Sequence, residues 1–382
     1  MVPDRRWPCC RAPEAGAETE KGAHAVRILH VVPTRPFGGA QRMALSLAGQ
    51  QCRNGHDARV LMLRCDDETR SRAGRYGCDV QAVPGPGLLA TVRATEEALR
   101  AFRGEVVHLH MPPPWMAELI DARRDRLNVL HLHALPPVAS LSSLRAVLTA
   151  PLIKRLAHRV DRLIAVSNWA RDAWQREYPT LKTPISVVYN AVPVEPIVRE
   201  VRSGATFSIG IACRLQTGCG IEEFLEFGQL LVGRRPNVRL VIAGDGPNRG
   251  QFEADAIRRG LGDCIRFLGF VEHIEAFWQE LDLAVYTGHA EPFGLRLIEP
   301  VAAGVPLIAY RNGTGSDEVI ARLPGVIAVP YGAAAALVDA AETLMNDPEL
   351  ASRVSVQGMT DVRAHFSLQR MADEIMSSYV HA

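Results

Sequence analysis

Short apolar runs alternate with amphipathic stretches along most of the chain. In the first half such runs lie at residues 25–33, 57–63, 105–112, 127–135 and 161–167. In the second half they lie at 207–215, 238–246, 264–271, 282–288, 305–310 and 325–330. Continuous apolar runs are typical of strands buried on both faces of a parallel sheet. With helical stretches between them, such as 41–55, 221–233 and 249–260, they predict two doubly wound α/β units.

The pattern also predicts the domain boundaries. The chain has 382 residues, which is more than one ordinary core accommodates. Residues 1–25 are rich in Ala, Pro and Glu and lack the apolar core of a secretory signal, so we expect a disordered tail. The proline-containing, polar segment 190–206 is the predicted linker. The first domain is therefore expected at 26–195 and the second from 196 onward.

Composition narrows the setting. No apolar run is long enough to span a bilayer, and the eight cysteines form no CxxC pair or metal-ligand spacing, so we expect a cytoplasmic protein with reduced thiols and no metal site. Residues 26–195 carry 23 basic and 15 acidic residues, whereas residues 196–382 carry 16 and 23. The first half is thus expected to face something anionic. Its basic stretch 144–163 has two interpretations, a solvated helix face or a contact with anionic lipid.

Two carboxylates, Glu291 and Glu299, flank the turn Phe293-Gly294-Leu295. A short helix is predicted to begin near Gly294, whose lack of a side chain lets backbone N–H groups approach an anion. Carboxylates accept hydrogen bonds from the hydroxyls of a ribose or hexose, so the stretch suits a sugar nucleotide. The alternative is a capped helix with two solvated acids, and the stretch alone does not separate the two.

Two other patterns carry less weight. Gly244-Asp-Gly246-Pro, with Gly250, has glycine spacing that invites a dinucleotide interpretation, but Pro247 and the position of its strand argue against a nicotinamide site. His108 and His110 alternate on a predicted strand. We expect His110 to face the cleft and His108 to be structural.

The ordered set of motifs resembles a known family. EPFGLRLIE (291–299) is similar to the E-x7-E motif of retaining glycosyltransferases with the two-Rossmann GT-B fold, above all glycosyltransferase family 4. GGAQRMALSLAGQQCRNGHDARVLML, VVYNAV, VIAGDGPNRGQFEADAIRRGLGDCIRFLGFV, GTGSDEVI and HFSLQRMADEIMSSYV look like further segments of that family, in its order. The resemblance covers about residues 26 to 382.

The resemblance implies roles for residues of the second domain, 196–365. Glu299 would hold the ribose of the donor nucleotide and Glu291 would contact the transferred sugar. The amides of Phe293, Gly294 and Leu295 would help to hold the sugar and phosphate.

It also implies roles elsewhere in the chain. Gly38 and Gly39 would let a helix N-terminus approach the donor diphosphate. His133 would touch the sugar, and Arg214 would neutralise the leaving diphosphate. The C-terminal helix, 366–382, would pack back on the first domain.

The resulting expectation is a glycosyltransferase that moves a hexose, with retention, from a nucleoside-diphosphate sugar to a glycan or lipid-linked acceptor in polysaccharide or glycolipid biosynthesis. The resemblance implies no cofactor and no metal, which the lack of any Asp-x-Asp fits. Nucleic acid is not an expected partner. Peripheral contact with the inner face of the cell membrane is a further expectation. The alternatives are a non-hydrolysing sugar-nucleotide epimerase and a catalytically degenerate binding or scaffold protein.

Three positions depart from the family pattern. Cys219 stands where a second phosphate-binding cation, lysine, is usual, and residues 196–382 contain no lysine at all. Either another arginine compensates, with Arg296 and Arg311 as candidates, or the chain is slow or inactive. Pro300 follows Glu299 directly and is expected to delay or kink the helix. Thr314 replaces a usual glycine.

Overall fold

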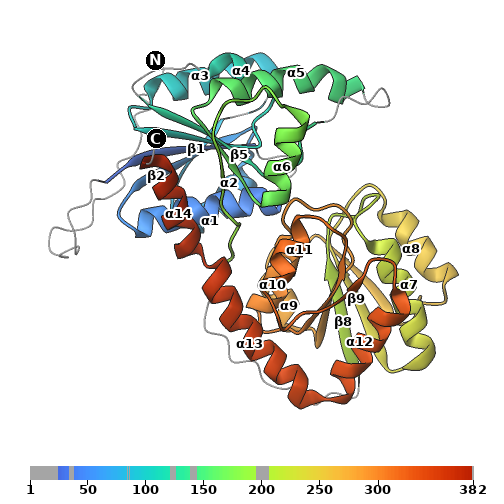
Figure 1. The fold of residues 1–382 in the computed structure, drawn as a ribbon. Coiled ribbons are helices and arrows are strands. Elements are labelled where there is room, and N and C mark those ends of the chain that lie inside the picture. Colours follow the sequence, from blue (N-terminus) through green and yellow to red (C-terminus); the bar gives the residue numbers. More distant parts are fainter. Residues whose placement is uncertain are drawn as a thin grey trace.

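The computed structural model describes residues 25–33, 38–83, 85, 87–120, 126–137, 144–194 and 206–380. The predicted tail lies almost entirely outside these residues, and so do residues 195–205 of the predicted linker. Figure 1 shows two α/β halves, one above the other, with the last two long helices running along both.

The first half is built on a seven-stranded parallel sheet. Its strands are β1 Arg27–Pro33, β2 Asp57–Leu63, β3 Asp79–Val83, β4 Val106–His110, β5 Leu127–Leu132, β6 Arg162–Ala165 and β7 Ile185–Val187. They lie in the order β3-β2-β1-β4-β5-β6-β7. The five apolar runs predicted five of these strands, and β3 and β7 were missed. The helices are α1 Gly39–Arg53, α2 Asp67–Gly74, α3 Leu88–Ala101, α4 Met116–Leu119, α5 Leu144–Arg159 and α6 Asn168–Glu177.

The second half repeats this plan with six parallel strands. They are β8 Phe207–Ala212, β9 Val238–Ala243, β10 Ile265–Gly269, β11 Leu283–Tyr286, β12 Leu307–Arg311 and β13 Ile327–Pro330, in the order β10-β9-β8-β11-β12-β13. The helices that follow these strands are α7 Ile221–Arg234, α8 Arg249–Arg258, α9 Ile274–Gln279, α10 Leu295–Ala302, α11 Gly315–Ile320 and α12 Ala334–Asn346. Each of the six strands begins within one of the six apolar runs of this half, and β12 alone extends one residue beyond its run.

In both sheets, the order in which strands are added reverses at the first strand. The order runs outward from β1 to β2 on one side and to β4 on the other, and from β8 to β9 and β11 in the second sheet. Ligands of open α/β sheets bind beyond the carboxyl ends of the strands at such a switch point. The topology therefore predicts one site at the place where the two switch points face each other.

The chain returns to the first half at its end. Helix α13 (Pro348–Phe366) packs on α10 and α12 of the second half, and α14 (Leu368–Val380) packs on α1 of the first. Leu368, Met371, Ala372 and Ile375 of α14 are buried in the same core as α1, β1 and β2. Burial of this apolar face, not covalent connection alone, holds the last helix against the first half.

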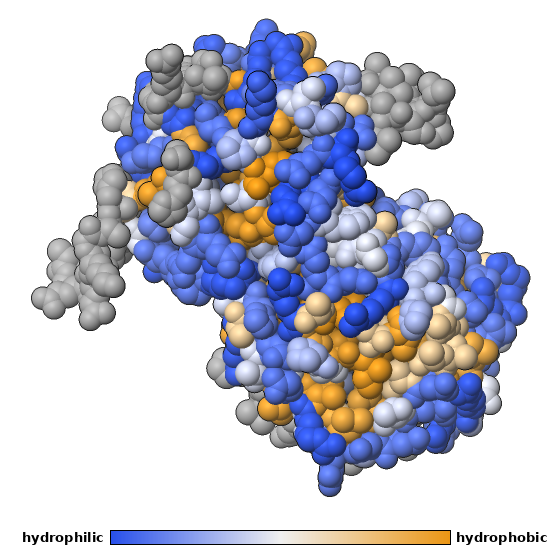
Figure 2. Space-filling model, viewed as in Figure 1, coloured by the Kyte–Doolittle hydropathy of each residue, from blue (hydrophilic) through white to orange (hydrophobic). Residues whose placement is uncertain are grey.

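Within the part of the chain that the structure describes, no helix is both long enough and apolar enough to cross a membrane. On the face drawn in Figure 2, hydrophilic areas border the hydrophobic ones on both halves. The predicted membrane contact therefore depends on the basic helix considered below.

Candidate functional site

A cavity of about 1020 Å³ lies between the two halves at their switch points. The first half contributes α1, α2 and the residue after β4, and the second half contributes the ends of β8 and β9 together with α9 and α10. Five predicted site residues line it, namely Gly38, Gly39, Arg214, Leu295 and Glu299. Four others, His133, Glu291, Phe293 and Gly294, are not among the lining residues. The structure thus brings five of the nine predicted site residues together at one cavity and leaves the other four outside its lining.

Helix α10 presents Glu299 to the cavity. Gly294 precedes the helix with φ of 99°, a backbone conformation that side chains disfavour, and the helix begins at Leu295. The expected delay caused by Pro300 is therefore wrong, because Pro300 lies inside a helix that starts where Gly294 predicts. A Cβ on Gly39 would lie only 2.9 Å from Leu295 Cδ1. The start of α1 and the side chain of Leu295 of α10 thus approach each other closely across the cleft.

Glu299 makes an ion pair with the first half. Arg42 of α1 donates from Nη2 to Glu299 Oε1 at 2.7 Å, and the side chains are 29% and 11% exposed. Burial raises the pKa of Glu299, while Arg42 acts in the opposite direction. A buried carboxylate needs such a cation, because an unpaired charge in the interior is costly. The predicted ribose-binding group is therefore already held by an arginine 257 residues away in the chain.

Glu291 pairs with a different arginine. Arg296, one turn before Glu299, donates to Glu291, and its Nη1 donates to the carbonyl oxygen of Cys219 at 3.1 Å. The guanidinium also lies over the ring of Tyr286, 5.3 Å from its centre. Arg296 therefore connects the loop that carries Glu291 to the loop that carries Cys219.

Five histidines from β1, β4, β5 and the residue after β5 form a row across the first sheet, and His133, which follows β5, stands at its end. Gln51 Oε1 accepts from His30 Nε2 at 2.7 Å, since the amide nitrogen of Gln51 donates to Met376 Sδ. The free nitrogen of His30 then accepts from His110 Nε2 at 2.9 Å, and His110 Nδ1 accepts from His133 Nε2 at 3.0 Å. These hydrogen bonds thereby assign one tautomer to each of the three rings of His30, His110 and His133.

Burial keeps these rings neutral. It lowers the pKa of His30 to about 4 and that of His133 to about 3. His110 was expected to face the cleft, but its side chain is buried. Burial and the neighbouring histidines lower its pKa well below the usual value. At neutral pH, His133 can therefore act as a neutral hydrogen-bonding group and not as a cation.

The same row contains the described residues that could hold a metal. His30, His108 and His110, and likewise His110, His131 and His133, place one nitrogen each within 4.8 Å of the others. The rings of His108 and His110 are stacked with centres 4.3 Å apart, and those of His131 and His133 with centres 4.1 Å apart. Lone pairs of imidazole lie in the ring plane, so stacked rings do not aim them at one point. A metal would need at least one ring to turn.

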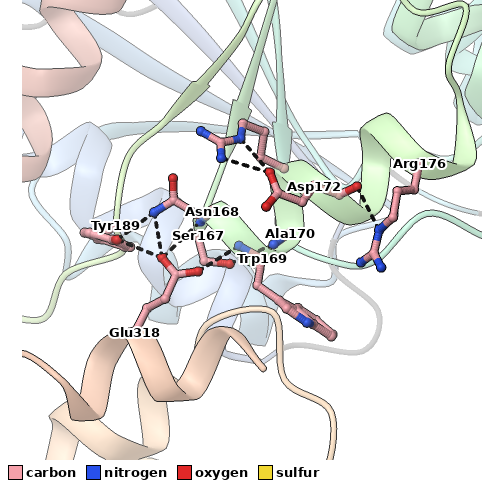
Figure 3. Close-up of polar contacts among 9 residues, drawn as sticks. Ser167, Asn168, Trp169, Ala170, Asp172, Arg176, Tyr189 and Glu318 are labelled. Carbon is pink, nitrogen blue, oxygen red and sulfur yellow. Dashed lines mark hydrogen bonds and ion pairs between the residues drawn. The ribbon is translucent and has the colours of Figure 1, made fainter. Parts of the chain in front are cut away.

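A second polar contact joins the halves beside the cavity (Figure 3). Glu318 of α11 accepts from the backbone N–H groups of Asn168 at 3.1 Å and Trp169 at 2.7 Å, and from the Tyr189 hydroxyl at 2.7 Å. These N–H groups form the start of α6, where a carboxylate is favoured by the helix dipole. Ser167, which caps α6, also donates to the carbonyl of Pro292 in the Glu291 loop.

The predicted basic face is less free than its sequence indicates. Arg155 and Arg159 of α5 both pair with Glu118, at 2.9 and 3.6 Å. Arg162 lies in β6 and is 9% exposed. Lys154 is exposed, and the side chain of Arg145 lies outside the described residues. The membrane contact stays a prediction with fewer available charges.

Sequence reasoning missed the groups that reach across the cleft. Arg42 was not singled out, although its position three residues after Gly39 places it on the first turn of α1, which lines the cavity opposite α10. Asn168 belongs to none of the quoted motifs, and Tyr189 lies in VVYNAV but was not singled out. Only the three-dimensional arrangement shows that each meets an acid from the other half.

Two doubly wound units with a cavity between their switch points define the GT-B architecture. Residues 37–196 match the family model described as Glycosyltransferase Family 4, and residues 206–360 match the one described as Glycosyl transferases group 1. Together the two matches span most of the chain, which belongs to this family of glycosyltransferases. The predicted family, fold class and enzyme class are confirmed.

Relatives and solved structures agree with this assignment. The chain is 30% identical to an alpha-D-kanosaminyltransferase of Streptomyces kanamyceticus over 44% of this chain and 43% of that one. It is 25% identical to the O-antigen chain mannosyltransferase C of Escherichia coli over 93% and 97%. The structure of Anabaena HepE with UDP and glucose covers 92% of this chain and 99% of that one, with a TM-score of 0.75 and 17% identity. The chain spans less than half of the length of the first two curated relatives that it matches.

Proposed function

We propose that the enzyme transfers a hexose, with retention of configuration, from a nucleoside-diphosphate sugar to a glycan or lipid-linked acceptor. The observation that carries this proposal is the interdomain cavity, in which Glu299 and Arg214 of the second half face Gly38 and Gly39 of the first. The cavity thus offers a carboxylate for ribose hydroxyls, a cation for phosphate, and a helix start suited to an anion. HepE, which binds UDP and glucose, has the same fold.

The proposed chemistry needs no protein nucleophile. The bond between the sugar C1 and the diphosphate oxygen breaks, and its electron pair stays on the departing diphosphate. The acceptor hydroxyl attacks C1 from the same face, and its proton passes to a diphosphate oxygen. Positive charge and oriented amides lower the barrier by stabilising the negative charge as it develops. We expect no metal or other cofactor for this step.

Donor entry requires the cavity to exchange one contact for another. Arg42 now donates to Glu299, and a ribose would have to share or replace that hydrogen bond. Arg42 lies at the first turn of α1, beside Gly38 and Gly39, so a released guanidinium remains next to the proposed diphosphate position. The ion pair therefore places a positive charge beside the buried carboxyl group of Glu299 before a donor arrives.

The test is calorimetric titration of the purified protein with UDP and with GDP. We expect one of them to bind, and Glu299→Gln to weaken it about tenfold to a hundredfold, because an acceptor of two ribose hydroxyls loses its charge. Glu349→Ala, which changes a side chain that is 90% exposed, serves as the control. If neither nucleotide binds the wild type, the transferase proposal fails and the scaffold alternative takes its place.

Incubation with the sugar nucleotide alone separates the enzyme alternatives. A transferase is expected to release nucleoside diphosphate slowly, together with a sugar of the donor's anomeric configuration, which NMR detects before mutarotation. Conversion of one sugar nucleotide into another would favour the epimerase instead.

A further inference from the structure

The second half lacks the lysine that its family uses near the diphosphate. Cys219 occupies that position, is 7% exposed and packs into the core of the second half. No lysine occurs anywhere in residues 196–382. A diphosphate held by Arg214 alone would lose a charge-assisted contact of the kind that stabilises phosphate most strongly.

The structure distinguishes between the two arginines of the second half, Arg296 and Arg311, that the sequence offers as replacements for the lysine. Arg311 is the last residue of β12, is exposed, and is not among the residues that line the cavity. Arg296 lines the cavity, and its Nη1 lies 3.1 Å from the carbonyl oxygen of Cys219. Among the described residues of the second half that line the cavity, Arg214 and Arg296 are the only arginines. The guanidinium of Arg296 therefore stands directly beside the position of the missing lysine.

The residues around Arg296 form a pocket that matches the shape and charge of a guanidinium. A Cβ on Gly288 would lie 2.6 Å from Arg296 Nη2, so this glycine leaves the room that the group fills. Tyr286 supplies an aromatic face, and Cys219 supplies a carbonyl acceptor. Burial alone would lower the pKa of Arg296, but Glu291, Cys213 and Tyr286 raise it above its usual value. The group is charged and held in one place.

We propose that Arg296 supplies the second positive charge for the donor diphosphate. Its side chain extends from α10 to the place where the lysine of the family pattern would extend from the loop before α7. This inference rests on the proposed function of the cavity. A guanidinium has five N–H donors, and the contacts to Cys219 and Glu291 leave others for phosphate oxygens. When the sugar C1–oxygen bond breaks, Arg214 and Arg296 together stabilise the negative charge that collects on the leaving diphosphate.

The experiment compares nucleoside diphosphate with nucleoside monophosphate. Titrations use UDP with UMP, and GDP with GMP, on the wild type, on Arg296→Leu and on Arg311→Leu as the matched control. For the base that binds, we expect Arg296→Leu to weaken the diphosphate about tenfold to a hundredfold and the monophosphate less than threefold. Arg311→Leu is expected to change neither.

A second pair of variants excludes an indirect effect. Arg296→Leu leaves Glu291 without its partner, and a stranded carboxylate would itself repel a diphosphate. Glu291→Gln combined with Arg296→Leu removes both charges, and Glu291→Gln alone is its reference. If Arg296 binds the diphosphate, the double variant still binds the diphosphate at least tenfold more weakly than Glu291→Gln does. Thermal melting confirms that each variant is folded before titration.

The outcomes are distinguishable. Equal diphosphate affinity in the double variant and in Glu291→Gln overturns the role of Arg296 and leaves the proposed function standing. An equal loss for diphosphate and monophosphate also overturns it, since the effect would then not depend on the second phosphate. Absence of any nucleotide binding by the wild type overturns the proposed function and this inference together.

Discussion

Glu291 and Glu299 each meet an arginine, and the two arginines come from different halves of the molecule. Arg296 belongs to the same helix as Glu299 yet pairs with Glu291, whereas Glu299 pairs with Arg42 of α1. A buried carboxylate without a cation would take up a proton or destabilise the fold. Each acid therefore has a positive charge beside it, Glu299 at the lining of the cavity and Glu291 in the loop before α10.

The thiol of Cys219 has a lowered pKa. A hydrogen bond from Cys213 is the largest cause, and backbone N–H groups and Arg296 add to it, so that the pKa of Cys219 falls to about 6. We expect thiolate absorbance at 240 nm to rise with a midpoint near pH 6, and this step to be missing in Cys219→Ser. A midpoint near the ordinary thiol value would contradict the structure.

The same shift has a consequence for stability. The folded pKa lies below the ordinary thiol value of about 8.5, so folding releases a proton between those two pH values. The wild type should therefore gain stability over Cys219→Ser as the pH rises through this window, and lose that advantage as the pH falls through 6. Chemical denaturation at pH 5.5 and pH 8.5 measures the difference.

At the scale of single elements, the start of α6 is the clearest contact between the halves. Helix α6 begins at Asn168 after the cap Ser167, and Glu318 satisfies two of its free N–H groups. Burial alone would raise the pKa of Glu318, but hydrogen bonds from Trp169, Tyr189 and Asn168 outweigh it and lower the pKa. Tyr189 responds in the opposite direction, with burial and Glu318 raising its pKa to about 12.

Glu318→Gln is expected to lower the free energy of unfolding by about 1–3 kcal/mol, because N–H groups at a helix start lose a charged acceptor. The stabilisation is present above the ordinary glutamate pKa and is lost as the pH falls through the lowered folded value. Chemical denaturation at pH 7 and below pH 4 tests this, with Glu349→Ala as the exposed control. The difference between Glu318→Gln and the wild type should shrink at low pH. An unchanged difference would argue against the carboxylate's role.

The sequence predicted those elements whose residues alone determine them. Strands such as β2, with an apolar run buried on both faces, are visible as patterns. Strand β3 mixes polar and apolar positions in five residues, and β7 has only three residues, so neither forms a pattern. Gly294 fixed the start of α10 despite Pro300. The partners of Glu299 and Glu318 lie in the other half of the chain, and contact at that distance follows from docking, not from local sequence.

At the scale of the whole molecule, the two halves meet where the chain passes between them. Val192, at the end of the described first half, donates its N–H to the carbonyl oxygen of Phe366 at 3.1 Å. Ser367 is extended and separates α13 on the second half from α14 on the first. The return of the chain thus lies beside the segment that leads into the linker. Any change in the angle between the halves has to be taken up here.

Phe366 connects this passage to the loop before α10, which carries Glu291 and Phe293. Its ring is fully buried and makes edge contacts with Phe293, 5.8 Å between centres, and with Tyr189, 6.4 Å. Phe293 precedes Gly294 and is buried, so its side chain anchors the loop before α10 in the core. The predicted role of Phe293 was limited to its amide, and the structure adds this packing function.

Phe366→Ala should therefore disturb stability and binding together. Loss of a buried phenylalanine is expected to cost about 3–5 kcal/mol of unfolding free energy. The nucleotide that binds the wild type should also bind less tightly at a temperature where the variant is still folded, because Phe293 loses a neighbour that fixes the loop before α10. Denaturant titration and calorimetry measure the two effects, with His365→Ala, an exposed neighbour, as the control. If stability fell while the affinity of the folded protein stayed the same, Phe366 would serve the fold alone, and the packing between the passage and the loop would have no part in donor binding.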